Sequence, residues 1–307
     1  MLVFDHIKGL VAAPFTPFTP EGELNTKVIP DYYRLLKKNK VIGAFICGST
    51  GEGPSLTLDE KKAVFRAWAL ATSHDHEFKV IAFLGGTSIP ECQLLASYAR
   101  EQGLYATAFT APYYFKPADL EALILTCAEV ARVAPDLPFY YYHSPVLTGV
   151  HFSMFPFLVQ LQDRIPNFVG IKYTHEDFMD YMACLNYRNQ KYNMLWGRDE
   201  NYLAACAVGA QGAVGSTYNY AAPLYHHLQD AFDQNNFDQA RQWQLTSIEM
   251  IKLLGKYGGI ATGKAYMKLI GLDCGPCRLP VKNLDQPAWT SFQADVKTIQ
   301  FERYRSQ

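Results

Sequence analysis

The chain has 307 residues, of which 49% are hydrophobic and 19% are charged, and its formal net charge is -1. This composition is typical of a globular protein, and the length suits either one large domain or two ordinary ones. The lysines and arginines form no basic stripe, so we expect no nucleic-acid partner. No apolar run approaches the roughly 20 residues that cross a bilayer, so we expect no membrane partner.

The seven cysteines are scattered and often stand in apolar runs, as at Cys47, Cys127 and Cys206. Such cysteines fit reduced thiols better than a disulfide framework. The first ten residues contain Asp5 and Lys8 and make a poor signal peptide. The expected location is the cytoplasm.

Eight short runs rich in β-branched or aromatic residues alternate with amphipathic stretches. They predict strands at residues 10–13, 42–47, 79–84, 106–110, 139–142, 169–173, 194–196 and 212–215. Helical patterns between them include residues 58–72, 91–102, 120–133 and 201–208. Apolar runs of this kind are typical of a parallel sheet. Eight such units favour an α/β fold of the TIM-barrel type, although spacing alone leaves a doubly wound sheet open.

The pattern changes after Pro223, where only helices are predicted, at residues 224–234, 237–256, 262–270 and 288–301. We therefore predict a (β/α)8 barrel over residues 1–222 that carries the active site. Residues 223–307 are predicted to form a helical extension packed on that barrel.

Small and reactive residues follow the predicted strands, and in a TIM barrel those positions form the catalytic face. Residues 48–53 read Gly-Ser-Thr-Gly-Glu-Gly, and their N–H groups and two hydroxyls suit an anion. A tight turn is the alternative. Tyr140 and Tyr142 share one face of their strand, where a hydroxyl at the strand end can relay a proton or simply pack.

Lys172 stands inside the apolar run Phe-Val-Gly-Ile-Lys-Tyr at residues 168–173. Burial disfavours an ammonium and lowers the pKa of a lysine, which frees the amine to attack a carbonyl. Gly170, two residues earlier on the same face, is expected to leave space beside it. The alternative is a lysine that reaches from the strand end to solvent.

Other motifs are weaker. Asp199 and Glu200 follow the seventh predicted strand and Ser216 follows the eighth, positions where helix capping is also common. The eight histidines show no ligand spacing, so no metal is expected. The segment Cys-Gly-Pro-Cys at residues 274–277 has the thioredoxin spacing but not its strand-to-helix context, which argues against a redox role.

Taken together, Gly-Ser-Thr-Gly-Glu, Tyr-Tyr, Tyr-x-x-Pro and Gly-Ile-Lys, in this order and spacing, resemble the N-acetylneuraminate lyase and dihydrodipicolinate synthase superfamily from residue 10 to about 280. Within it, residues 142–150 and 209–219 are similar to the lyase branch, and Leu147 stands where synthases typically carry arginine. Two residues depart from the pattern: Ser144 replaces a larger apolar residue and Cys277 replaces an expected proline.

The resemblance implies a metal-free TIM-barrel enzyme without a cofactor, in which Lys172 forms a Schiff base with a 2-keto acid and Tyr142 carries the proton. Ser49 and Thr50 would hold the substrate carboxylate, with Thr174 orienting that network. Four residues would face the hydroxyls of a sugar acid: Gly197 through its backbone, Asp199, Glu200 and Ser216. Tyr114 would reach a neighbouring subunit's site in a homotetramer.

The implied reaction is the cleavage of sialic acid to N-acetylmannosamine and pyruvate. Two alternatives remain open at this stage. Another pyruvate-dependent aldolase or dehydratase would keep Lys172 and Tyr142 but prefer a different aldehyde. A keto-acid-binding regulator would use the same barrel without turnover, although an intact lysine–tyrosine pair argues against it.

Overall fold

The computed structural model describes residues 4–307 and contains a closed barrel of eight parallel strands in the order β1 to β8. The strands are β1 Gly9–Ala12, β2 Gly43–Ile46, β3 Lys79–Phe83, β4 Ala106–Thr110, β5 Phe139–His143, β6 Phe168–Tyr173, β7 Asn193–Trp196 and β8 Gly212–Gly215. Each of the eight predicted strands is present, with small shifts at the ends. The prediction of a TIM barrel is therefore confirmed, and the doubly wound alternative is wrong because β1 pairs with β8.

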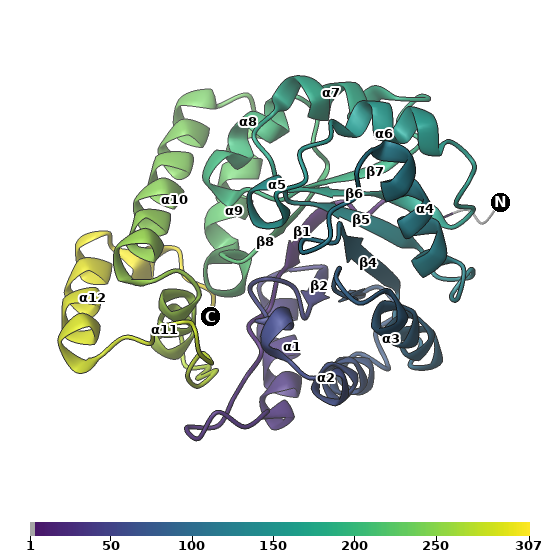
Figure 1. Ribbon diagram of the computed structural model, residues 1–307. Helices are drawn as coiled ribbons and strands as arrows, with labels where there is room; N and C mark the ends of the chain where they lie inside the picture. Colours follow the sequence, from purple (N-terminus) through teal and green to yellow (C-terminus); the bar gives the residue numbers. More distant parts are fainter. Residues whose placement is uncertain (1–3) are drawn as a thin grey trace.

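Helices surround this barrel on all sides (Figure 1). Those of the βα units are α1 Ile29–Lys38, α2 Leu58–Ala71, α3 Ile89–Glu101, α4 Leu120–Ala131, α5 Pro145–Thr148, α6 Met154–Leu161, α7 Phe178–Asn186, α8 Tyr202–Ala207 and α9 Tyr218–Asp233. Short 3-10 turns occur at η1 Thr26–Val28, η2 Gly53–Ser55, η3 Asp199–Asn201 and η4 Phe301–Arg303. The helices predicted from the sequence do not include α6, although its buried residues Met154, Phe157, Leu158 and Leu161 recur at helical spacing.

The C-terminal part consists of α10 Phe237–Tyr257, α11 Ile260–Leu269 and α12 Gln286–Thr298, which gather on one side of the barrel next to α9 (Figure 1). Helix α9 begins directly after β8 and continues across residues 222 and 223, with a kink at Ala221. No helix among residues 4–307 is long and apolar enough to span a bilayer.

Two apolar layers explain why the strands are buried on both faces. The inner layer fills the barrel and includes Val11, Phe45, Ile81, Tyr140 and Leu195. The outer layer lies between strands and helices, and alternate residues of each strand enter it, as Tyr141 does on β5. Tyr140 and Tyr142 both belong to the inner layer, as their alternation predicts.

The two ends of the barrel differ in chemistry. A cavity of about 380 Å³ lies at the amino-terminal ends of the strands, lined by residues that include His6, Tyr140 and Tyr192. In TIM barrels this end serves stability, whereas the carboxyl-terminal end carries active sites. Lys172 and Tyr142 lie at this carboxyl-terminal end, on β6 and β5.

Candidate active site

Lys172 and Tyr142 are direct neighbours across the β5–β6 pair, where the register places one opposite the other. Gly170, also on β6, is needed for a reason other than the expected space beside Lys172. A Cβ at residue 170 would lie 1.9 Å from the carbonyl oxygen of Asn193, so only glycine lets β7 approach this closely.

The amine of Lys172 lies among aromatic rings rather than carboxylates. Its Nζ is 3.8 Å from the ring centre of Phe45 and 4.1 Å from that of Tyr142, and the residue is only 5% exposed. Burial lowers the pKa of Lys172, although the nearby Tyr142 and Asp199 oppose that shift. This shift increases the share of the neutral amine, which is the nucleophilic form.

The pKa of the Tyr142 phenol is shifted in the same direction as that of Lys172. Burial alone would raise the pKa of Tyr142, but the positive charge of Lys172 and the hydroxyls of Ser49, Ser144 and Thr174 outweigh burial and lower it. The rings of Phe45 and Phe83 pack edge-on against Tyr142 with centroids 5.5 and 5.7 Å away. Two groups with lowered pKa values therefore face each other across β5 and β6.

Ser49 and Thr50 lie in the loop between β2 and η2, and both are partly exposed. The loop closes on itself, because Gly53 N–H donates to the Gly48 carbonyl (3.0 Å) and Glu52 N–H donates to the Ser49 carbonyl (3.1 Å). Gly53 packs so tightly that a Cβ there would lie 1.9 Å from the Cys47 carbonyl oxygen. Ser49 is thereby brought to the hydroxyl of Tyr142, as its effect on that phenol indicates.

Thr174 follows β6 and Gly197 follows β7, and the Thr174 hydroxyl lies directly against the Gly197 backbone. The buried Thr174 Oγ1 lies near enough to the Tyr142 phenol to lower its pKa, and within residues 4–307 it has no hydrogen bond of ordinary geometry. The backbone at both positions is fixed by strand-like hydrogen bonds, from Thr174 N–H to the His143 carbonyl and from Gly197 N–H to the Tyr173 carbonyl, each 2.8 Å.

Asp199 opens η3 and is 5% exposed. Its Oδ2 accepts from the Thr217 N–H (3.0 Å) and hydroxyl (2.6 Å), whereas the buried Oδ1 has no hydrogen-bond partner in the described part of the chain. Burial raises the pKa of Asp199, the charge of Glu200 adds to the rise, and the donors of Thr217 oppose it. One carboxylate oxygen is thus left available beside Lys172.

Glu200 and Ser216 are partly exposed at the same end of the barrel. Glu200 is not a free acid, since Arg198 Nη2 lies 2.7 Å from its carboxylate and 2.7 Å from that of Glu176. Ser216 directly follows β8, and its carbonyl accepts a hydrogen bond from the Asn219 side chain (2.7 Å). The ends of β7 and β8 therefore present carboxylates, a guanidinium and a hydroxyl together.

Tyr114 is placed differently from the other predicted site residues. Its side chain is 79% exposed and contacts its neighbour Phe115, which is 85% exposed. In the single chain Tyr114 is therefore a surface residue. Leu147, on α5, is also largely exposed, at 62%.

Several residues of the site were not found from the sequence. Phe45 and Phe83 surround the reactive groups but look like ordinary core residues, and only their inward-facing strand positions could have indicated them. Thr217, which binds Asp199, lies next to the predicted Ser216, and a hydroxyl cluster after a strand was its only signal. His143 is not a base, because burial, helped by His175 and His151, lowers its pKa to about 3.

The fold and the site together define a class of protein. It is a TIM barrel whose carboxyl-terminal face carries a buried lysine next to a tyrosine of lowered pKa, together with hydroxyl and carboxylate side chains. No group of three or more His, Cys, Asp or Glu residues in the described range is arranged to hold a metal ion. The amine can attack a carbonyl, and the phenol can exchange the protons that follow.

Similarity to known proteins shows which family the chain belongs to. Residues 6–299 match the Dihydrodipicolinate synthetase family, and the chain belongs to it. It is 39% identical to human N-acetylneuraminate lyase over 299 residues, which cover 96% of this chain and 93% of that protein. The resemblance inferred from the motifs is thereby confirmed.

Solved structures agree with this assignment. N-acetylneuraminate lyase from Proteus mirabilis superposes with a TM-score of 0.93 at 36% identity, covering 97% of this chain and all of that one. A dihydrodipicolinate synthase from Bacillus anthracis superposes with a TM-score of 0.89 at 26% identity, covering 96% of this chain and 99% of that one. Both branches of the family share the fold, and the higher identity is with the lyase.

Proposed function

We propose that this protein cleaves N-acetylneuraminate to N-acetylmannosamine and pyruvate through a Schiff base on Lys172. The observation that carries the proposal is the buried Lys172–Tyr142 pair at the barrel mouth, in a chain 39% identical over nearly its whole length to a protein named for this reaction.

The proposed mechanism uses the amine and the phenol that face each other across β5 and β6. Neutral Lys172 attacks the ketone of the open-chain sugar acid, and loss of water gives a protonated imine. The imine draws electrons from the bond between the α and β carbons, and Tyr142 takes the proton of the hydroxyl on the β carbon as that bond breaks. The aldehyde N-acetylmannosamine leaves, and the enamine is protonated and hydrolysed to pyruvate, which regenerates the amine.

The binding roles divide between the two sides of the site. Ser49 and Thr50 would hold the carboxylate beside the ketone, with Thr174 between that carboxylate and Tyr142. The sugar chain would extend toward Asp199, Glu200, Ser216 and the Gly197 backbone. Acids and a hydroxyl suit a polyhydroxylated chain, since each can accept or donate a hydrogen bond. Leu147 provides no guanidinium to pair with the second carboxylate of a dicarboxylate product, which disfavours the synthase reaction.

An assay that couples released pyruvate to a reductase tests this proposal across a panel of sugar acids. We expect the highest kcat/KM with N-acetylneuraminate. A higher value with a shorter 2-keto-3-deoxy sugar acid, or faster condensation of pyruvate with aspartate semialdehyde, would contradict the substrate while leaving the lysine chemistry intact.

The sugar side can be tested separately with Ser216→Ala. Losing one hydrogen bond should lower kcat/KM for the sugar acid by up to about tenfold. The yield of the borohydride-reduced pyruvate adduct should not change, because Ser216 lies on the sugar side. Equal losses in both measurements would argue against this division of the site.

We also propose that the enzyme is a cytoplasmic homotetramer in which Tyr114 completes the site of a neighbouring subunit. Tyr113, Tyr114 and Phe115 form an exposed aromatic segment, which is unusual unless another surface covers it. All seven cysteines are free, as expected in a reducing compartment. Light scattering should give four chains per particle, and a fully active monomer would contradict the proposal.

A further inference from the structure

A second buried ionic group lies behind the Ser49–Thr50 loop, outside the site described above. Lys264 of α11 lies with its Nζ 2.8 Å from Glu52 Oε1, and the two side chains are only 4% and 2% exposed. Removing two charges from water is costly, so such a pair is a weak means of adding stability. Its location directly beneath the loop suggests a different use.

Glu52 connects this pair to the substrate loop. It stands three residues after Ser49 and adopts a left-handed backbone conformation, with φ of 54°. A non-glycine residue in this conformation persists only when its surroundings hold it there. Hydrogen bonds hold both the backbone and the side chain of Glu52. Its N–H donates to the Ser49 carbonyl, and its Oε2 accepts from the Arg278 backbone N–H at 2.9 Å.

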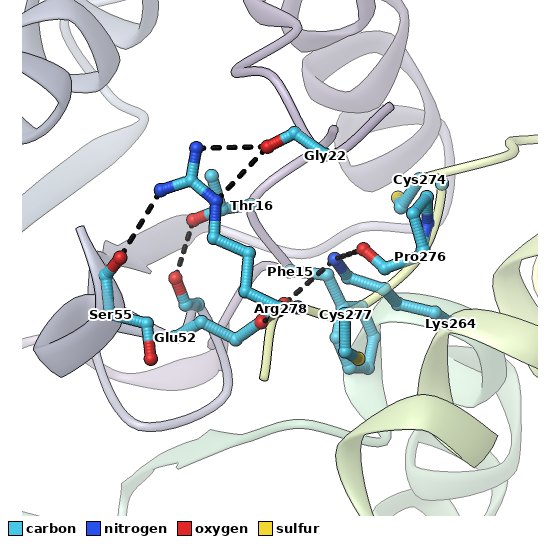
Figure 2. Close-up of polar contacts among 12 residues, drawn as sticks. Phe15, Thr16, Gly22, Glu52, Ser55, Lys264, Cys274, Pro276, Cys277 and Arg278 are labelled. Carbon is cyan, nitrogen blue, oxygen red and sulfur yellow. Dashed lines mark hydrogen bonds and ion pairs between the residues drawn. The ribbon is translucent and has the colours of Figure 1, made fainter. Parts of the chain in front are cut away.

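The C-terminal segment around residue 276 supplies the other half of the anchor (Figure 2). Lys264 donates to the Pro276 carbonyl at 2.8 Å, so its ammonium bridges that carbonyl and the Glu52 carboxylate. The Arg278 side chain extends along the same surface and donates to the carbonyls of Gly22 (2.9 Å) and Ser55 (3.2 Å). Ser55 lies just beyond the substrate loop, so the loop is held from the inside by Lys264 and from the outside by Arg278.

Alternative uses of this cluster are less well supported. Cys274 and Cys277 flank Pro276, but burial raises the pKa of each thiol to about 12, which disfavours the reactive thiolate. Lys264 Nζ lies 4.4 Å from the ring centre of Phe18 and contacts the Glu52 carboxylate and the Pro276 carbonyl, so each of its polar contacts joins it to the protein itself. The cluster therefore holds a position and carries no chemistry of its own.

We propose that Glu52 is a positioning residue for keto-acid binding: anchored by Lys264 and the Arg278 N–H, it fixes the loop that presents Ser49 and Thr50. This inference rests on the proposed function, because it assumes that the two hydroxyls bind the carboxylate of the keto acid. It predicts that the C-terminal extension sets the affinity for the keto acid while the reactivity of Lys172 is set elsewhere.

The test must separate positioning from mere stability. Two neutral double variants do so, because replacing both members of a buried pair avoids leaving a single unpaired charge. Glu52→Gln/Lys264→Met retains an acceptor for the Arg278 N–H. Glu52→Met/Lys264→Met has a similar volume but no acceptor. Each variant is titrated with pyruvate, trapped with borohydride and analysed by mass spectrometry for the adduct on Lys172.

We expect the glutamine variant to keep a half-saturating pyruvate concentration within about threefold of the parent. The methionine variant should need roughly tenfold more pyruvate, the effect of losing one hydrogen bond to a charged acceptor. Its maximal trapped fraction should be unchanged. Equal half-saturating concentrations in the two variants would overturn the proposal, since Glu52 would then serve stability alone.

A third variant and a control complete the design. If the methionine variant does not fold, Glu52→Asp is used in its place, because it keeps the charge but shortens the side chain. It should also raise the half-saturating pyruvate concentration. An affinity equal to that of the parent would overturn the proposal. Lys268→Met on the same helix, whose exposed ammonium pairs with Asp273, is the matched control and should behave as the parent. A parent protein that forms no adduct on Lys172 would refute the proposed function, and this inference with it.

Discussion

The protein contains two buried lysines whose surroundings differ, Lys172 on β6 and Lys264 on α11. Both are about equally inaccessible, at 5% and 4% exposure. Lys264 faces the Glu52 carboxylate at 2.8 Å, whereas Lys172 lies on the rings of Phe45 and Tyr142. Burial by itself therefore does not make a nucleophile. The surroundings distinguish the two: Lys264 is paired with a carboxylate, whereas Lys172 packs on aromatic rings and burial lowers its pKa.

We expect the largest loss of activity when Lys172 itself is replaced. Lys172→Ala should abolish the borohydride-dependent adduct with pyruvate, because no other amine lies on the rings of Phe45 and Tyr142 among the described residues. Cleavage should fall by more than roughly 10⁴-fold, since covalent catalysis is lost entirely. The Glu52→Gln/Lys264→Met variant should still form the adduct at saturating pyruvate. An adduct that remained in Lys172→Ala and mapped to Lys264 would reverse the two roles.

Tyr142→Phe tests the role of the phenol that lies next to Lys172 and has no counterpart beside Lys264 in the part of the chain that the structure describes. Turnover should fall by roughly 10²–10⁴, the usual contribution of a positioned acid or base. Pyruvate binding should suffer less, because the ring and its contact with the amine remain. Steady-state kinetics together with the adduct yield measure the two effects. Near-normal turnover would show that another group carries the proton.

The pH dependence of adduct formation tests how burial and Asp199 act on the pKa of Lys172. Burial lowers the pKa of this lysine, and the nearby charge of Asp199 raises it. The reactive neutral amine is lost as pH falls through that pKa, so the rate of adduct formation should decline on the acid side. Asp199→Asn removes the opposing charge, and the acid limb should move to lower pH. An unchanged or higher midpoint would show that Asp199 does not act on the amine.

The smallest expected effect is on stability. Burial raises the pKa of Asp199 in the folded protein. The protonated acid therefore contributes to folding stability at low pH, and this contribution is lost as pH rises through the raised pKa. Asp199→Asn avoids the buried charge and should raise Tm by roughly 2–4 °C at pH 8. Scanning calorimetry should show the gain shrinking toward pH 5.

Asp180 on α7 is the matched control for that measurement. It is also a buried acid, but its two oxygens accept hydrogen bonds from Met154 N–H (2.8 Å), Phe155 N–H (2.9 Å) and the Tyr173 hydroxyl (3.0 Å). Asp180→Asn loses acceptor capacity, so it should lower Tm at both pH values. Similar Tm shifts for the two variants would contradict a stability cost that is specific to the buried charge of Asp199.

Much of the fold and of the candidate site could be predicted from the sequence. The eight strands follow from short apolar runs, because a parallel strand buried on two faces needs apolar side chains on both. Alternation along β5 placed Tyr140 and Tyr142 on one face. Lys172 was conspicuous because a lysine inside such a run needs a reason for its burial.

The groups that surround these residues come from distant strands and could not be predicted from the sequence. Gly170 is required by the backbone of β7, and Phe45 and Phe83 reach Tyr142 from β2 and β3. Contacts of this kind join residues that are far apart in the chain, and no local pattern encodes them. The pairing of Glu52 with Lys264 spans more than 200 residues, and either residue alone looks like an ordinary surface charge in the sequence. Local patterns in the sequence thus predict the barrel and single out Lys172, while the packing of distant segments places aromatic rings beside Lys172 and a carboxylate beside Lys264.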